Sequence, residues 1–303
     1  MEQPKYTSCL RPLNTEILVK QLYEGKSINL VGHPDAGRAR MLDDIVRCAT
    51  ATKHIRLNMK AYRNSYEALL KSIATQMGIA YHEDTSMADL TAIISRQSVK
   101  VFMLIDNFDA VLDNPELDSK YTRSFFDTLN SFKNQANISL LCATTKPHEN
   151  SSIYIGGRDF GTSWLELQGE GLRDLDIENV EIELDRQLTN SDLWKNTDAD
   201  TKKMYLNEIF AEKNNYEFLC YVAKQFQLQN STDIATLSVE EKIKRWRKEF
   251  EDLQPTKTAA KQARALRKGV KGWWIRFEMS KLAKLLPVRV ILNFINEFRN
   301  KKE

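Results

Sequence analysis

Short apolar runs alternate with stretches of helical periodicity over the first 190 or so residues of the chain. The runs 101–106 and 138–144 are apolar without alternation, which is typical of strands buried on both faces of a sheet. Further strands are predicted at 27–31, 54–59 and 180–184. Helices are predicted where apolar residues recur every three or four positions, over 14–24, 65–77, 87–96 and 120–132. Strands that alternate with helices predict an α/β fold with a doubly wound, parallel, five-stranded sheet.

The pattern changes after the fourth predicted strand. Residues 146–178 hold five glycines and little periodicity, which predicts a long loop or an insertion. From Thr189 onward all the periodicity is helical, so an all-helical C-terminal region is expected. Its helices are predicted at 202–210, 216–226, 239–253 and, beyond the break at Pro255, at 256–268, 273–286 and 288–300.

A glycine loop lies between the first predicted strand and a helix that carries Met41 and Ile45 on one face. Gly32 and Gly37 occupy the two glycine positions of the phosphate-binding pattern G-x-x-x-x-G-K-[ST], the P-loop. Backbone N–H groups of such a loop can surround an anion, and the N-terminus of the following helix adds a favourable dipole. The residues predicted to line a nucleotide site here are Gly32, Asp35, Ala36, Gly37, Arg38, Ala39 and Arg40.

Two positions of this loop depart from the pattern. Arg38 stands where the loop lysine belongs, and Ala39 stands where a hydroxyl would hold Mg²⁺. Arginine keeps the positive charge but not the compact ammonium contact, and alanine supplies no ligand to a metal. The strand, loop and helix therefore favour the fold, whereas the chemistry of the loop is incomplete.

Two later strands end in polar residues that extend the same site. Asp106 follows an apolar strand in the manner of Walker B, where one carboxylate reaches Mg²⁺; alone, it also fits a cap of the next turn. Asn107 follows where a catalytic carboxylate usually lies, and Asp109 is a weaker catalytic candidate. Thr144 ends the next strand, where a polar residue can sense the γ-phosphate. Ligands of such sheets bind beyond the carboxyl ends of the strands, so Asp106 and Thr144 are expected to converge with Gly32.

The order of these elements resembles the AAA+ superfamily and, more closely, its STAND branch of signalling ATPases. Residues 11–16 (Arg-Pro-Leu-Asn-Thr-Glu) resemble the arginine–glutamate box that precedes the P-loop in that branch, and 212–226 resembles its helical lid. The resemblance spans residues 7–230. It implies ATP or ADP with Mg²⁺ held by Asp106, and a role in signalling or in defence against phage and other mobile elements.

These features predict a P-loop domain over 1–188, a lid-like helical domain over 189–253 and a basic helical segment over 254–303. The replacements at Arg38, Ala39 and Asn107 predict negligible ATP hydrolysis, since each removed group contributes orders of magnitude to rate. The predicted function is a nucleotide-responsive or pseudo-ATPase regulatory or scaffold subunit that works with a protein partner or as a self-oligomer. The alternative is an active ATP-hydrolysing switch or motor in which Arg38 and Asp109 replace the missing groups.

Charge adds a third function class, a nucleic-acid-binding adaptor. Residues 1–240 hold 26 Lys and Arg against 34 Asp and Glu, whereas 241–303 hold 18 against 7. Binding of nucleic acid through 242–302 is therefore predicted, with Trp246, Trp273 and Trp274 available to stack on bases. An anionic membrane, an acidic protein or the chain's own acidic body would fit the same charge. The candidate contacts are Lys261, Arg264, Arg267, Lys268 and Lys271.

Cysteine usage and the N-terminus bear on the compartment. The four cysteines lie far apart without a C-x-x-C pair, which favours reduced thiols in the cytosol over a disulfide framework. The N-terminus shows no secretory signal pattern, and no segment reaches the roughly 20 apolar residues of a membrane span. A cytoplasmic protein is expected.

Overall fold

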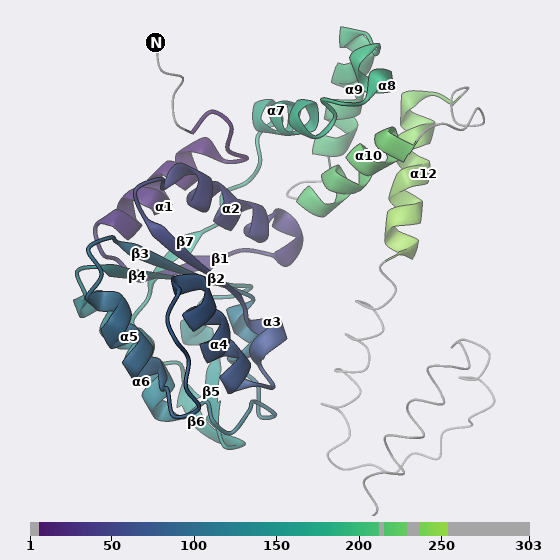
Figure 1. Ribbon diagram of the computed structural model, residues 1–303. Coiled ribbons are helices and arrows are strands. Elements are labelled where there is room, and N and C mark those ends of the chain that lie inside the picture. Colours follow the sequence, from purple (N-terminus) through teal and green to yellow (C-terminus); the bar gives the residue numbers. More distant parts are fainter. Residues whose placement is uncertain (1–5, 212–214, 229–236, 254–303) are drawn as a thin grey trace, which may run out of the picture. The chain divides into compact units, whose positions relative to one another are not determined.

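The structure is a computed structural model that describes residues 6–211, 215–228 and 237–253 (Figure 1). The described residues up to Phe250 belong to one unit, and all the elements below begin within it. The helices predicted beyond Pro255 and the five basic candidate contacts at 261–271 lie outside the described residues. Among the described residues, no helix is both long enough and apolar enough to cross a membrane.

A five-stranded sheet forms the centre of this unit, with the strand order β2-β3-β4-β1-β7. Every pair of neighbouring strands in it is parallel, which confirms the predicted fold class. The register sets Asn58 beside Asp106 and Val31 beside Thr144, so the carboxyl ends lie along one edge. The strands are β1 (Ile28–Val31), β2 (Lys53–Asn58), β3 (Val101–Asp106), β4 (Ile138–Thr144) and β7 (Gln168–Gly171).

The fifth strand is β7, so the prediction of a strand at 180–184 is wrong. Those residues lie in helix α7 (Ile177–Gln187), where Val180 and Leu184 are buried on one face and Asp176 caps the N-terminus. The β7 sequence Gln-Gly-Glu-Gly carries no apolar side chain because it lies at the sheet edge and pairs with β1 through its backbone. Its formation depends on the partner strand, so hydrophobic periodicity could not reveal it.

The segment predicted as a loop at 146–178 also contains an antiparallel hairpin. It is built from β5 (Ser152–Ile155) and β6 (Arg158–Thr162). Gly156 and Gly157 both have positive φ between the strands, which suits a tight connection. Ile153 is fully buried and pairs with Leu112, so the hairpin is fixed to the body through this one strand.

Helices cover both faces of the sheet (Figure 1). On one face, α1 (Pro12–Tyr23) and α2 (Arg38–Cys48) pack with the Phe102 and Leu104 side chains of β3. On the other face, Met103 and Ile105 of the same strand contact the helices that follow β2 and β3. Successive side chains of a strand point to opposite faces, which explains why β3 is apolar without alternation. The helices of the second face are α3 (Met59–Tyr62), α4 (Tyr66–Met77), α5 (Met87–Ser95) and α6 (Arg123–Ser131).

The chain after α7 is helical throughout the described residues, as predicted. Its core is an aromatic cluster in which the Trp246 ring stacks on the Tyr205 ring, with 6.2 Å between the ring centroids. Trp246 is completely buried, so of the three candidate tryptophans this ring is not available to stack on unpaired bases. The helices of this part are α8 (Asp192–Lys195), α9 (Ala199–Phe210), α10 (Tyr216–Leu228) and α12 (Val239–Asp252).

Candidate nucleotide site

The glycine loop connects β1 to α2 at the carboxyl edge of the sheet. It contains a single 3-10 turn, η1 (Pro34–Ala36), and Gly37 then turns the chain into α2, which begins at Arg38. Gly37 has a φ of +83°, a left-handed conformation that glycine adopts without steric penalty. The predicted sequence of strand, glycine loop and helix is therefore present.

Arg38 folds back over the start of this loop and is only 2% exposed. Its Nη1 donates to the Gly32 carbonyl at 3.2 Å, and its Nη2 donates to Asn107 Oδ1 at 3.0 Å. The carboxylates of Asp106 and Asp109 each lie 3.6 Å from a guanidinium nitrogen. Both terminal nitrogens of the side chain that a P-loop would extend toward a phosphate are thus bonded to acceptors of this chain, while its Nε is buried without a hydrogen-bond partner.

Asn107 and Asp109 are also fixed by contacts of their own. Asn107 adopts a left-handed backbone with φ of +52°, and its side-chain amide donates to Asn58 Oδ1 at 3.2 Å. Asp109 lies in η2 (Phe108–Ala110), and its carboxylate accepts both the N–H and the hydroxyl of Thr145 at 3.0 Å. Asp109 therefore connects Thr145, which follows β4, to Arg38, so its carboxylate is already engaged by groups of this chain.

Thr144 ends β4 as predicted, but its side chain is engaged inside the sheet. The residue is fully buried, and its hydroxyl accepts a hydrogen bond of 2.7 Å from the Asn29 side chain. Its carbonyl accepts the Gly32 N–H at 3.0 Å, which fixes the start of the loop to β4. Ala39, in contrast, is exposed on the first turn of α2 and offers only a methyl group.

Both glycines of the loop are covered by side chains from later in the sequence. A Cβ added at Gly37 would lie 2.9 Å from the Tyr216 ring of α10. A Cβ added at Gly32 would lie 2.8 Å from Leu172, which follows β7. Glycine is therefore required at both positions by close packing within this chain, in addition to any role toward an anion.

Arg40 and Glu183 connect α2 to α7 beside this contact. Arg40 is 9% exposed; its guanidinium donates to Asp44 and, at 3.0 Å, to Glu183. Tyr216 donates its hydroxyl to the same Glu183 carboxylate at 2.9 Å. Burial alone would raise the pKa of Glu183, but hydrogen bonds from Arg186, Arg40 and Gln187 outweigh it and lower the pKa to about 2.

Arg11 contacts the loop from the N-terminal side. It is 4% exposed, and its Nη2 donates to the Ala36 carbonyl at 2.8 Å. Burial lowers the pKa of this guanidinium to about 10, although the Asp174 and Asp44 carboxylates act in the opposite direction. The arginine of segment 11–16 thus lies against the loop that it precedes in the sequence.

In this arrangement the predicted site residues do not fit a magnesium nucleotide. The Arg38 guanidinium already lies 3.6 Å from the carboxylates of both Asp106 and Asp109, and Ala39 supplies no ligand. Among the described residues, no group of three or more His, Cys, Asp or Glu side chains is placed to hold a metal ion. Sequence reasoning missed the roles of Glu183 and Tyr216, because their contacts to α2 and the loop join segments more than 140 residues apart.

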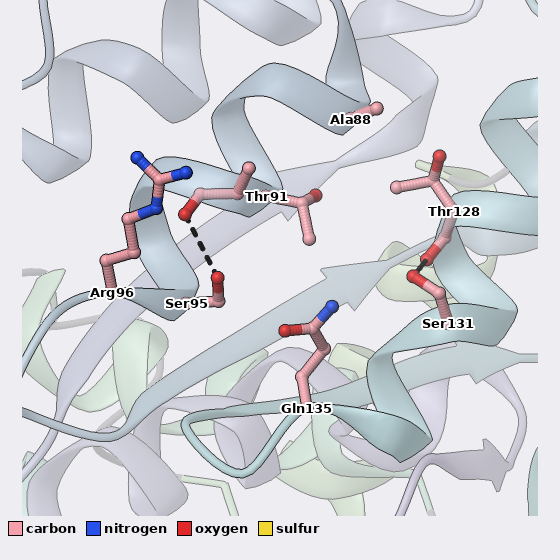
Figure 2. A pocket seen from close by; sticks show the side chains of 8 residues that line it. Ala88, Thr91, Ser95, Arg96, Thr128, Ser131 and Gln135 are labelled. Atoms are coloured by element: carbon pink, nitrogen blue, oxygen red, sulfur yellow. Dashed lines mark hydrogen bonds between the residues drawn. The ribbon is translucent and has the colours of Figure 1, made fainter.

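A separate hollow of about 310 Å³ lies between α5 and α6 (Figure 2). Arg96 and Gln135 in its lining come a few residues before β3 and β4, so it lies near the amino ends of these strands. The hydroxyls of Ser95 and Ser131 donate to carbonyls of their own helices. It contains none of the predicted site residues and adds nothing to the loop site.

Three solved structures are similar to this chain. The ORC1 protein of Aeropyrum pernix in complex with DNA matches with a TM-score of 0.50 and 16% identity, over 80% of this chain and 65% of that chain. Drosophila ORC bound to DNA matches with a TM-score of 0.47 and 14% identity, over 83% of this chain and 63% of that chain. Cdc6p from Pyrobaculum aerophilum matches with a TM-score of 0.45 and 15% identity, over 71% of this chain and 61% of that chain.

The chain spans less than two thirds of the length of each of these proteins. No protein-family model and no curated protein matches the sequence. The structural similarity, together with the sheet order, shows an AAA+ fold. At 16% identity it shows the fold alone, and assignment to the STAND branch stays a prediction.

Proposed function

We propose that this chain is an AAA+-fold regulatory or scaffold protein whose P-loop is filled by its own side chains and which does not turn over ATP. The observation that carries the proposal is the buried Arg38 guanidinium, bonded to Gly32 and Asn107 and flanked by Asp106 and Asp109. A cation balanced by two carboxylates gives little attraction to a phosphate.

Rearrangement toward a nucleotide-binding state would be unfavourable for two further reasons. If Arg38 turned to a phosphate, the carboxylates of Asp106 and Asp109 would face added negative charge without their internal partner. The Tyr216 ring would also have to leave Gly37 before the backbone there could approach a ligand. When the competent state is a small fraction of the population, the apparent affinity falls by that fraction.

The direct test is phosphate release by the full chain with ATP and Mg²⁺. We expect no release above the buffer rate from the natural sequence or from an Asp106→Ala variant. Turnover by the natural sequence that disappears in Asp106→Ala would instead establish the alternative function, an active ATP-hydrolysing switch. A triple variant, Arg38→Lys with Ala39→Thr and Asn107→Glu, tests whether replacing the three residues is enough to create binding or turnover.

Nucleotide binding without turnover is tested separately. A nucleotide that binds only the folded state raises its stability by about 2.7 kcal/mol at 100 times Kd. We expect ATP and ADP to leave the thermal midpoint of the natural sequence unchanged and to raise that of the triple variant. A higher thermal midpoint of the natural sequence with ATP or ADP would mean that the chain binds nucleotide. It would then be a nucleotide-responsive subunit, the first of the two regulatory roles that the sequence predicts.

A function in signalling or in defence against phage and other mobile elements is proposed only through the STAND resemblance at 11–16 and 212–226. In this proposal the chain acts by assembly with a protein partner or with copies of itself. Light scattering of the purified chain across a range of concentrations would detect self-assembly. A mass equal to one chain at every concentration would remove the self-oligomer from the proposal.

Nucleic-acid binding is the second candidate, and the charge of the C-terminal quarter favours it. The Aeropyrum pernix ORC1 structure is a complex with DNA, and residues 241–303 of this chain have 18 basic against 7 acidic side chains. Phosphate contacts release counterions, so affinity for duplex DNA should fall by about 0.9 log units per contact for each tenfold rise in salt.

A salt series with labelled DNA and RNA tests this candidate. Glutamine at Lys261, Arg264, Arg267 and Lys268 should weaken binding and flatten the salt dependence. The matched control places glutamine at four exposed lysines of the body: Lys20, Lys60, Lys120 and Lys203. Equal binding by both variants, or none by the natural sequence at low salt, would exclude these contacts. Anionic vesicles in the same series distinguish a membrane surface from nucleic acid.

A further inference from the structure

Two cysteine thiols that lie far apart in the sequence meet in the core at the C-terminal end of α2. Cys9 lies in the turn segment before α1, and Cys48 is the last residue of α2, 39 positions later. Their sulfur atoms are 3.3 Å apart and share a hydrogen bond, and each residue is 2% exposed. Contact between two thiols at this distance has no role in the loop site or in the proposed function.

We propose that Cys9 and Cys48 form a reversible disulfide that fastens residues 6–11 to α2. Both neighbours of Cys9 are already held on the same helix. The Ser8 carbonyl accepts from Arg47 at 2.9 Å, and the Leu10 N–H donates to Asp44 at 2.9 Å. The three consecutive residues 8–10 therefore contact three side chains of one helix, at positions 44, 47 and 48.

The step that closes the bond requires a short approach of the two sulfurs. A disulfide is about 2.05 Å long, so the 3.3 Å contact must shorten by about 1.2 Å. Cys9 can supply this movement because it lies in a turn, outside any helix or strand. The pair is not part of a metal site, since no suitable group of three His, Cys, Asp or Glu side chains occurs among the described residues.

Formation of the disulfide needs a two-electron oxidant, and in this proposal the oxidant is a small-molecule disulfide such as oxidised glutathione. One cysteine thiolate attacks a sulfur of the small disulfide, forms a mixed disulfide and releases one thiol. The second thiolate then attacks the bonded cysteine sulfur, forms the Cys9–Cys48 bond and releases a second thiol. The protons of the two cysteines end on the two released thiols, and the cycle reverses with excess thiol.

Burial controls the rate of this exchange. Burial and the hydrogen bond shared with Cys48 raise the pKa of the Cys9 thiol, so the docked thiol is rarely ionised near pH 8. Opening of the turn segment must therefore precede attack. The disulfide would keep the segment closed, and this segment continues into Arg11, which holds the Ala36 carbonyl of the loop.

Peptide mapping of the full chain tests the proposal. The chain is incubated with oxidised glutathione at pH 8, alkylated and cleaved with trypsin without reductant. We expect a linked pair made of peptide 6–20 and peptide 48–53, lost on treatment with dithiothreitol. Cys142 and Cys220 lie in other peptides, 134–158 and 214–224, which report competing reactions. Glutathione on peptides 6–20 and 48–53 separately, or reaction confined to Cys220, would overturn the proposal.

Thermal unfolding of the reduced and the oxidised chain gives a second readout, with two cysteine variants as controls. A bond that closes a loop of this length should raise the thermal midpoint of the oxidised chain by on the order of 5 °C, reversibly. The Cys220→Ser variant is the matched control and should show the same rise, whereas Cys9→Ser should show none. An oxidised chain that carries the linked peptides but has the same thermal midpoint as the reduced chain would contradict the fastening of residues 6–11.

Discussion

Arg38 and Arg40 lie two positions apart on the first turn of α2 and are both buried, yet they serve different regions. Arg38 donates to neutral oxygens of Gly32 and Asn107, and its nearest carboxylate oxygens are 3.6 Å away. Arg40 donates directly to two carboxylates, those of Asp44 and Glu183, whose side chains are 0% and 2% exposed.

This difference assigns the two arginines to different roles: Arg38 fills the loop site, and Arg40 stabilises the fold. The acidic partners of Arg38 are 13% and 30% exposed, so solvent weakens their attraction to it. The side chains of Arg40, Asp44 and Glu183 are almost fully buried, and their ion pairs join α2 to α7. We therefore expect changes around Arg40 to alter the free energy of unfolding strongly. Changes at Arg38 should alter this free energy less.

The largest effect is expected for Glu183→Ala. This change leaves Arg40 and Arg186 without their shared partner, and breaking a buried ion pair costs about 3–5 kcal/mol. Urea unfolding followed by circular dichroism measures the loss. Glu181→Ala, at an exposed position of the same helix, is the control and should change stability by less than about 0.5 kcal/mol. Equal effects of the two variants would mean that the network does not hold α7 to α2.

Acid should weaken the same region. The pKa of Glu183 is lowered to about 2 from an ordinary value of 4.5, so its contribution is complete above pH 4.5 and is lost as the pH falls toward 2. The lost contribution amounts to about 3 kcal/mol. Asp44 acts in the opposite sense, because burial raises its pKa despite Arg40 and Arg47.

Comparison with Glu183→Gln isolates the Glu183 contribution, since Asp44 is the same in both proteins. The difference in unfolding free energy between the natural sequence and this variant should shrink steadily between pH 4.5 and pH 2. A difference that stays constant over this range would show that Glu183 titrates alike in the folded and unfolded chain.

Alanine substitutions at two glycines, Gly37 and Gly78, test the contact between the glycine loop and α10. Gly37 and Gly78 both have positive φ, +83° and +67°, so alanine at either position costs about 1–2 kcal/mol. Only at Gly37 does the new Cβ meet another group, the Tyr216 ring at 2.9 Å, whereas nothing lies within 4 Å at Gly78. Gly37→Ala should therefore be less stable than Gly78→Ala by about 1–3 kcal/mol, measured in urea.

A cycle with Tyr216→Ala sharpens this comparison. If the ring causes the extra loss, Gly37→Ala should be less harmful in the Tyr216→Ala background and match Gly78→Ala there. An unchanged loss in that background would assign the effect to the backbone of the loop alone.

The sequence predicted the sheet well because its central strands carry their own signal. β3 and β4 are buried on both faces, so their apolar runs mark them without any partner. The strand-loop-helix order at Gly32 and Gly37 also follows from local chemistry. β7 was missed because an exposed edge strand of Gln, Gly and Glu has no hydrophobic pattern, and the apolar pair Val180 and Leu184 fits a helix as well as a strand.

The loop site was predicted in position but not in its contacts. Asp106 and Thr144 were expected to converge with Gly32, and they do: the Thr144 carbonyl accepts the Gly32 N–H, and Arg38 lies between Gly32 and Asp106. No local rule shows that Arg38 turns inward, that Thr144 bonds Asn29, or that Tyr216 covers Gly37. Each of these depends on side chains brought together from distant segments, and periodicity carries no information about such pairs.

The smallest expected effect is that of Tyr216→Phe, which keeps the ring on Gly37 and removes only its hydroxyl. Glu183 would lose one donor but retain Arg40, Arg186 and Gln187, so the loss should be about 1 kcal/mol. Tyr221→Phe on the same helix is the control, because its hydroxyl donates to Glu249 near solvent and should contribute less. Urea unfolding of both variants gives the comparison. A loss above about 3 kcal/mol for Tyr216→Phe would mean that the hydroxyl, and not the two arginines, holds the Glu183 carboxylate between α2 and α10.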